Sequence, residues 1–336
     1  MKKLRLLLFP FAIVYEFITW SRNWLYDNGI FKSASFELPI IVVGNLSVGG
    51  TGKTPQIEYL IRLLSDKYQI AVLSRGYKRQ SKGFILADET STVLTLGDEP
   101  FQYFQKFKQI QVAVDANRVN GIQRLLELPK KPKIILMDDA FQHRKVKAGF
   151  YVLLTTYNDL YCNDYILPMG NLRESCIGAK RANLIIVTKC PKHISENEQL
   201  KIKMELNLNS NQSLYFSFID YNDAATAEHQ SISIHDLRAK NKTIVAGIAK
   251  PKPFIDYVKN DQDDVLIYAD HHAFSNDDLL EIDKKSIDKI ILTTEKDYVR
   301  LKHTFLKNKL FYLGIKTGFV ANENQFKQEI LDFVTS

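Results

Sequence analysis

The sequence predicts an α/β protein with two lobes, each built on a mostly parallel sheet. Two observations lead to this fold class. Short apolar runs alternate with helical stretches from residue 40 onward, and the runs are continuous, as in strands that are covered on both faces. With 336 residues, of which 45% are hydrophobic and 25% charged, the chain is long enough for two folded units.

The predicted strands form two groups along the chain. Six runs belong to a first lobe: 40–44, 70–74, 111–115, 133–138, 150–155 and 182–188. Three more predict a second, smaller lobe: 242–248, 264–270 and 288–294. Between the groups, the segment 191–240 is richer in Asn, Ser, Glu and Lys and has a weaker pattern. We therefore expect 1–35 to be an apolar N-terminal helix, 36–190 a core, 191–240 a linking segment and 241–336 the second lobe.

The N-terminal segment 4–20, LRLLLFPFAIVYEFITW, is apolar almost throughout. It is shorter than the roughly 20 apolar residues of a spanning helix, and Pro10 and Glu16 interrupt it. No A-x-A-like cleavage site follows, which disfavours a signal peptide. Basic and aromatic residues at its ends suit a helix lying in a membrane interface: Lys2, Lys3, Arg5, Arg22, Trp20, Trp24 and Tyr26. A buried core helix is the alternative.

Charge and cysteine content restrict the partners. The net charge of +7 favours nucleotides, nucleic acid or anionic headgroups. No stripe of Lys and Arg interleaved with aromatic residues is present, so nucleic acid is disfavoured. Three cysteines without a CxxC pair predict neither a disulfide framework nor a zinc site, and a reducing compartment is expected.

Residues 47–54, SVGGTGKT, follow the first predicted strand and precede a predicted helix. This is the context of a Walker A loop, in which glycines let backbone N–H groups face phosphate oxygens at a helix N-terminus. Ser47 stands where the strict pattern has Gly. Lys53 is expected to neutralise the β- and γ-phosphates, and Thr54 to hold Mg²⁺. The full predicted nucleotide-binding set is Ser47, Val48, Gly49, Gly50, Thr51, Gly52, Lys53 and Thr54.

The run 133–139, KIILMDD, ends in two carboxylates, which is typical of a Walker B segment that orders the metal. Asp138 and Asp139 would point to opposite sides of a continuing strand, so a turn is needed for both to be ligands. A P-loop GTPase or a regulatory or metal-insertion ATPase is the alternative, although TKCP at 188–191 lacks the Asp of a guanine-recognition motif.

Less generic motifs accompany the loop. Together with VGNLSVGGTGKTP they resemble the tetraacyldisaccharide 4′-kinase family of lipid A biosynthesis over nearly the whole chain: SRGY (74–77), GDEP (97–100), DDAFQHR (138–144), LPMGNLRE (167–174), DHHAF (270–274) and TTEKD (293–297).

The resemblance implies transfer of the γ-phosphate of ATP, with Mg²⁺, to the 4′-hydroxyl of a tetraacyldisaccharide 1-phosphate, giving lipid IVA. It implies a P-loop NTPase-like core with a smaller Rossmann-like lobe, and an active site between the lobes. It also implies an N-terminus that associates with the cytoplasmic face of the inner membrane, peripherally or as an anchor. The implied partners are the lipid A disaccharide precursor and the membrane surface, with no protein partner.

Transfer to a sugar hydroxyl needs charge neutralisation, in-line positioning and an acceptor for the hydroxyl proton. Asp98 in GDEP is the predicted base, and a neighbouring histidine would tune it. By resemblance this partner is His271, with His272 as the open alternative. Glu99 is expected to contact the metal or orient Asp98, and His143 to assist around the acid pair 138–139.

Further polar residues in these motifs are predicted to engage phosphates or the substrate headgroup, because guanidinium forks suit phosphate oxygens: Arg75, Arg118, Arg144, Arg173 and Glu174. A solvated surface pair is the alternative for each arginine. A peripheral membrane adaptor whose nucleotide only stabilises the fold is the non-enzymatic alternative.

Overall fold

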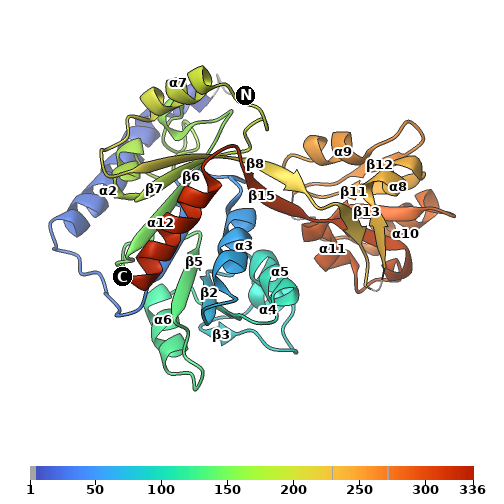
Figure 1. Ribbon diagram of the computed structural model, residues 1–336, viewed down its shortest axis with the longest axis horizontal. Helices are drawn as coiled ribbons and strands as arrows, with labels where there is room; N and C mark the ends of the chain where they lie inside the picture. The colour runs from blue at the N-terminus through green and yellow to red at the C-terminus, as the bar shows by residue number, and fades with distance from the viewer. Residues whose placement is uncertain (1–4, 229, 271) are drawn as a thin grey trace.

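The computed structural model describes residues 5–228, 230–270 and 272–336, which form a larger and a smaller lobe (Figure 1). The larger lobe contains a nine-stranded sheet that is parallel except at its two edges, where β3 and β15 run antiparallel. Each of the six runs predicted as strands of the first lobe forms one of its strands. In sheet order they are β15 (Ile315–Phe319), β8 (Ser213–Tyr221), β7 (Leu184–Thr188), β6 (Phe150–Thr156), β1 (Ile40–Asn45), β5 (Ile134–Asp138), β2 (Ile70–Ser74), β4 (Gln111–Val114) and β3 (Ile85–Leu86).

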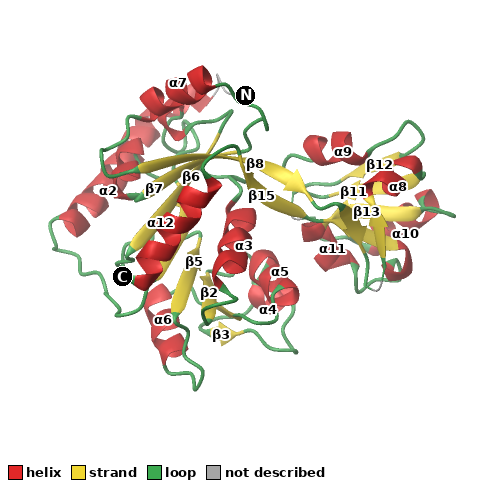
Figure 2. Ribbon diagram, viewed as in Figure 1, coloured by secondary structure: helices red, strands yellow, loops and turns green. Residues whose placement is uncertain are grey.

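Helices cover both faces of this sheet, as continuous apolar strands require (Figure 2). On one face Ile40 and Val42 of β1 pack with α2 (Phe9–Asp27), α6 (Arg118–Leu126) and α7 (Glu196–Leu206). On the other face Ile41 and Val43 pack with α3 (Lys53–Leu64), α5 (Asp98–Lys106) and α12 (Glu323–Thr335). Shorter helices complete the lobe: η1 (Leu6–Leu8), α4 (Val93–Leu96), η2 (Tyr161–Asn163) and η3 (Cys176–Arg181). The central strand β1 thus delivers the phosphate loop to the middle of the lobe.

The smaller lobe has a six-stranded sheet, parallel at its centre, with helices on both faces. Its strands in sheet order are β10 (Ser231–Ser233), β9 (Ala224–Thr226), β14 (Leu310–Leu313), β13 (Ile290–Thr294), β11 (Lys242–Ala246) and β12 (Asp264–Ile267). Its helices are α8 (Ile234–Ala239), α9 (Lys252–Val258), α10 (Asn276–Lys285), α11 (Glu295–Leu301) and η4 (Lys307–Lys309). The predicted fold class, two α/β lobes with mostly parallel sheets and an N-terminal helix, is confirmed.

The boundaries between the lobes differ from the expected ones at two places. The smaller lobe begins within the expected linking segment, because β9, β10 and α8 belong to it. The chain also returns before its end, since β15 pairs with β8 and α12 packs on the larger lobe (Figure 1). Burial of Phe326 and Ile330 of α12 against β1 and α3 explains the return. The connection between the lobes is therefore the antiparallel pair β8 and β15.

The N-terminal helix α2 lies on the larger lobe with most of its apolar side chains outside the core. Only Ala12 and Thr19 of α2 are buried, so the alternative of a buried core helix is wrong. Within residues 5–228, 230–270 and 272–336, no helix combines the length and the apolar character that crossing a membrane demands. Exposed apolar side chains gather on η1 and α2: Leu6, Leu7, Leu8, Phe9, Phe11, Ile13, Val14, Phe17, Ile18, Trp20 and Trp24.

Candidate active site

The phosphate loop joins the end of β1 to the start of α3. Gly49 (φ 116°) and Gly52 (φ 88°) adopt left-handed conformations that side chains with a Cβ rarely adopt, and Gly52 is the residue that precedes α3. Lys53 opens the helix. Its Nζ atom lies 3.3 Å from Oδ1 of Asn45 and 3.6 Å from Oδ1 of Asp139. The loop thus has the backbone turns and the inward-facing lysine that phosphate binding requires.

Neighbouring segments hold the loop in place. The Thr188 hydroxyl at the end of β7 donates to the Thr51 carbonyl at 2.7 Å, and the Val48 N–H donates to the Asn171 carbonyl at 2.7 Å. Lys189, in the TKCP motif, donates from Nζ to the Gly50 carbonyl. These bonds fix the shape of the loop between β1 and α3.

The acid pair lies beside Lys53, because β5 runs parallel to β1 in the sheet. The chain turns at Asp139 (φ 47°), which separates the two carboxylates. Asp139 accepts from Nη1 of Arg173 at 2.9 and 3.1 Å. Burial alone would raise the pKa of Asp139, but Lys53 and Arg173 bring it below its ordinary value. Arg173, predicted to bind phosphate or substrate, is thus ion-paired to Asp139.

Asp138 is buried at the end of β5. Burial, followed by the negative charges of Asp139 and Glu99, raises its pKa to about 7 against the opposing charge of Lys53. Its Oδ1 atom has no hydrogen-bond partner among the described residues. A buried carboxylate oxygen without a hydrogen-bond partner is a ligand atom that suits Mg²⁺. Thr54, the second residue of α3, would supply a hydroxyl oxygen from the phosphate loop. The residues present fit a hydrated Mg²⁺ ion, with Asp138 as the carboxylate ligand.

Tyr103 of α5 is a site residue that the motifs do not indicate. Its hydroxyl donates to Oδ2 of Asp138 at 3.4 Å and is hydrogen-bonded to Thr54. Burial, together with the charge of Asp138, raises the pKa of this phenol well above its ordinary value, so it stays protonated. The only signal in the sequence is its position, five residues after Asp98 in one short helix. Tyr103 connects α5 to the predicted metal ligands.

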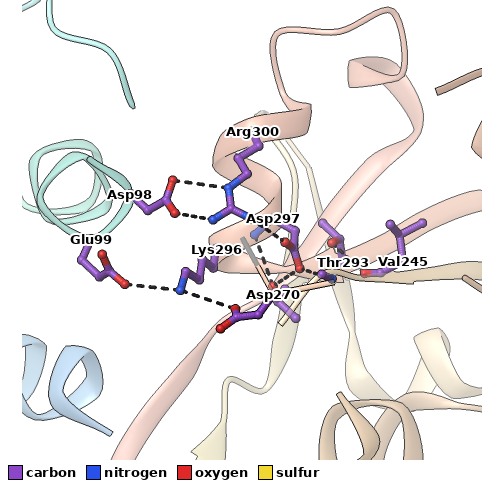
Figure 3. Close-up of polar contacts among 10 residues, drawn as sticks. Asp98, Glu99, Val245, Asp270, Thr293, Lys296, Asp297 and Arg300 are labelled. Atoms are coloured by element: carbon purple, nitrogen blue, oxygen red, sulfur yellow. Dashed lines mark hydrogen bonds and ion pairs between the residues drawn. The ribbon is translucent and has the colours of Figure 1, made fainter. Parts of the chain in front are cut away.

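Asp98 and Glu99 begin α5 and face the smaller lobe (Figure 3). Arg300 of α11 engages both carboxylate oxygens of Asp98, through Nη2 and through Nε at 3.3 Å. Lys296 of α11 lies 3.3 Å from Glu99 and 4.0 Å from Asp270. Acidic residues from one lobe are therefore matched by basic residues from the other.

The predicted partner His271 lies outside the described residues. Its alternative, His272, is described, and its Nε2 atom lies 2.9 Å from Oδ2 of Asp278. The His272 ring also stacks on Tyr268, with centroids 4.9 Å apart. His272 is thus engaged within the smaller lobe.

Two further predicted residues surround the acid pair. Arg118 is buried and donates to the Asp115 carbonyl at 3.0 Å and to the Asp138 carbonyl at 3.4 Å. Burial lowers the pKa of the Arg118 guanidinium to about 10. Its guanidinium supports the end of β5, and its role toward phosphate or substrate stays a prediction. Burial, reinforced by the charge of Arg118, lowers the pKa of His143 to about 4, so this ring is neutral near pH 7. Arg75 is exposed after β2.

Arg144 and Glu174 hold the N-terminal helix, although both were expected to bind phosphate or substrate. Arg144 donates to the Asn23 carbonyl at 2.9 Å and pairs with Asp27 at 2.6 Å. Glu174 is completely buried and accepts from Asn23 Nδ2 at 2.6 Å. A carboxylate without exposed surface cannot contact a substrate, so the expectation for Glu174 is wrong.

A phosphate loop that joins the central parallel strand β1 to a helix opening at Lys53, with the buried Asp138 at the end of the adjacent strand β5, is typical of P-loop enzymes that bind nucleoside triphosphates. The family model described as tetraacyldisaccharide-1-P 4′-kinase matches residues 4–335, and the chain belongs to that family.

Relatives and a solved structure agree with this assignment. The chain is 57% identical over 334 residues to the tetraacyldisaccharide 4′-kinase of Flavobacterium johnsoniae, covering 99% of this chain and 98% of the relative. It is 59% identical over 338 residues to that of Flavobacterium psychrophilum, covering 100% and 98%. The structure of LpxK from Aquifex aeolicus in complex with ATP superposes with a TM-score of 0.79 at 28% identity, covering 98% of this chain and 99% of that chain.

The chain is thus an ATP- and Mg²⁺-dependent kinase that phosphorylates the 4′ position of a tetraacyldisaccharide in lipid A synthesis. The predicted family, activity and cofactors are confirmed. The alternatives of a P-loop GTPase, a regulatory ATPase and a non-enzymatic adaptor are wrong.

Proposed function

We propose that Asp98 accepts the proton of the 4′-hydroxyl while the phosphate loop and Lys53 hold the ATP phosphates. The observation that carries this proposal is the placement of α5. This helix begins with Asp98, and its Tyr103 reaches both Asp138 and Thr54. One rigid element therefore ties the base to the residues that organise the phosphates, which suits an in-line transfer.

Each of these residues has a separate task in the transfer. The amides of the loop and the ammonium of Lys53 bind the phosphates and neutralise their charge. Thr54 and Asp138 would hold Mg²⁺, which shields phosphate charge when bound. Asp139, already paired with Lys53 and Arg173, orients these two cations instead of competing for the metal. His271 is proposed to assist Asp98 from the smaller lobe.

The base assignment is tested with Asp98→Asn. Because Asn keeps the shape of the side chain but cannot accept the proton, kcat is expected to fall at least about 100-fold while ATP affinity stays within about threefold. Asp66→Asn, an exposed acid after α3, serves as the control and should keep the wild-type kcat. A kcat for Asp98→Asn near that of the control would reject Asp98 as the base.

The membrane role rests on the two faces of α2. One face is fastened to the larger lobe: the Tyr15 hydroxyl donates to the Arg173 carbonyl at 3.1 Å, and Asn23 and Asp27 pair as described. The opposite face carries the exposed apolar side chains of η1 and α2. Arg5, just before η1, donates to the Pro168 carbonyl at 3.1 Å and to Asn171 Oδ1 at 3.0 Å, which fastens this end of the segment to the larger lobe.

We infer that this exposed face lies in the membrane interface, where a tetraacylated acceptor resides, on the cytoplasmic side where ATP is available. Fully burying one such apolar side chain contributes about 1.5–3 kcal/mol. Phe17→Glu should therefore weaken binding to phospholipid vesicles at least about tenfold. Ile287→Glu, an equally exposed apolar residue of the smaller lobe, should leave binding unchanged. Equal vesicle binding by both variants would contradict the inference.

A further inference from the structure

The carboxylate of Asp98 is held by a residue of the other lobe. Arg300 presents two nitrogen atoms, Nε and Nη2, to the two carboxylate oxygens of Asp98 (Figure 3). Both side chains are shielded, with 14% of Asp98 and 11% of Arg300 exposed. A guanidinium that contacts both oxygens fixes the plane of a carboxylate as well as its position, which a single point charge does not do.

Arg300 is in turn fixed by Asp297, one turn earlier in α11. Nη1 of Arg300 lies 3.4 Å from Oδ1 of Asp297, whose side chain is completely buried. Oδ2 of Asp297 accepts from the Gly247 N–H at 2.9 Å and from the Thr294 hydroxyl at 2.7 Å. A chain of polar contacts therefore runs from the sheet of the smaller lobe through Asp297 and Arg300 to Asp98.

Docking of the two lobes does not depend on Arg300 alone. Lys106 of α5 bridges Glu58 at 2.7 Å and Glu295 of α11 at 2.8 Å. Lys302, next to α11, donates to Gln105 at 3.0 Å and lies over the Phe101 ring. Lys106 and Lys302 already hold the lobes together, so the two-nitrogen contact of Arg300 with Asp98 is not needed for docking alone.

We propose that Arg300 is a positioning residue for phosphoryl transfer, which orients the carboxylate of Asp98 and makes its alignment depend on the docked smaller lobe. The proposal rests on the proposed role of Asp98 as the base. Arg300 touches neither the phosphates nor the hydroxyl in this role. It acts through Asp98, while the buried Asp297 keeps the guanidinium in its plane.

The test compares substitutions at two neighbouring interlobe cations. Arg300→Met removes the fork and keeps the apolar stem, and Lys302→Met is the matched control. Because misalignment of a reacting group by about 1 Å costs about 100-fold in rate, Arg300→Met is expected to lower kcat by about that factor with the KM for ATP within about threefold. Lys302→Met should keep kcat within about twofold. Arg300→Lys restores a charge without the fork and should recover about tenfold.

A double substitution separates this proposal from the base assignment. If Arg300 acts through Asp98, adding Arg300→Met to Asp98→Asn should lower kcat by less than about twofold. An equal loss from Arg300→Met in both backgrounds would overturn the proposal and leave Asp98 as the base. A kcat of Arg300→Met equal to that of Lys302→Met would also overturn the proposal. A wild-type kcat for Asp98→Asn would remove the base assignment itself. If Arg300→Met does not fold, by circular dichroism, Arg300→Lys decides, and a wild-type kcat there overturns the proposal.

Discussion

Glu174 offers a sharp prediction, because its residue type suggests a ligand and its surroundings indicate a structural anchor. The completely buried carboxylate accepts from Asn23 of α2 at 2.6 Å, Arg181 at 2.8 Å and Gln142 at 3.1 Å. Glu174→Ala leaves the Arg181 charge without its partner and removes the acceptor of the Asn23 amide, while Gln142 keeps its bond to the Asn45 carbonyl. Breaking a buried pair in this way costs about 3–5 kcal/mol. The lower end applies here, because the Arg181 side chain is 20% exposed and also lies over the Phe141 ring.

Amide hydrogen exchange of α2 reports this loss directly. A decrease of about 3 kcal/mol in the free energy of local opening accelerates exchange about 100-fold. Glu174→Gln keeps one oxygen that can accept from Arg181 and Gln142 but replaces the acceptor of Asn23 with an NH2 group, so it should accelerate exchange only about tenfold. The KM for the lipid acceptor, measured in detergent where membrane attachment is not needed, should change less than about threefold. A KM raised tenfold with unchanged exchange in α2 would refute this reasoning and return Glu174 to the substrate site.

Three other substitutions test separate parts of the structure. Burial lowers the pKa of His143 from 6.5 to about 4, so the folded protein binds fewer protons than the unfolded chain in this window, and stability falls as the pH falls through it. His143→Gln should reduce the drop in urea midpoint between pH 7 and pH 5, and an unchanged drop would contradict the assignment. The Phe326 ring of α12 contacts the rings of Phe319 and Tyr59. Phe326→Ala should therefore destabilise the larger lobe by about 3–5 kcal/mol in urea unfolding. Destabilisation confined to the smaller lobe would mean that α12 does not pack on the larger lobe. At Gly97 (φ 91°) an added Cβ would lie 2.9 Å from the Tyr77 carbonyl oxygen. Gly97→Ala should therefore shift the start of α5 and lower kcat at least about tenfold. A wild-type kcat would show that this backbone strain does not displace Asp98.

The parts of the molecule that could be predicted from sequence are those set by local patterns. A buried strand, a glycine-rich turn and a helix start follow one another within residues 40–64, and each has its own residue signature. The same holds for β5, whose apolar run ends at Asp138. The two segments were related in advance only as Walker A and Walker B motifs, and the structure shows that β1 and β5 are neighbours in the sheet.

What sequence reasoning missed depends on long-range packing. Asp98 and Arg300 are 202 positions apart, and no local pattern relates them. The return of α12 to the larger lobe could not be predicted either, because its apolar face fits either sheet until β15 pairs with β8. Arg144 and Glu174 have side chains that suit phosphate or sugar, and only their burial against α2 shows that they hold a helix.

The central claim is that the phosphate loop and Asp98 together transfer the γ-phosphate of ATP to the 4′-hydroxyl. The most direct measurement incubates the protein with γ-labelled ATP, Mg²⁺ and tetraacyldisaccharide 1-phosphate in detergent, and locates the label on the isolated lipid. We expect label on the 4′ oxygen with the wild type, and labelling at least about 100-fold slower with Asp98→Asn under conditions where that variant still binds ATP. Label at the 4′ oxygen at the wild-type rate in Asp98→Asn, or release of the label only as inorganic phosphate by the wild type, would contradict the claim.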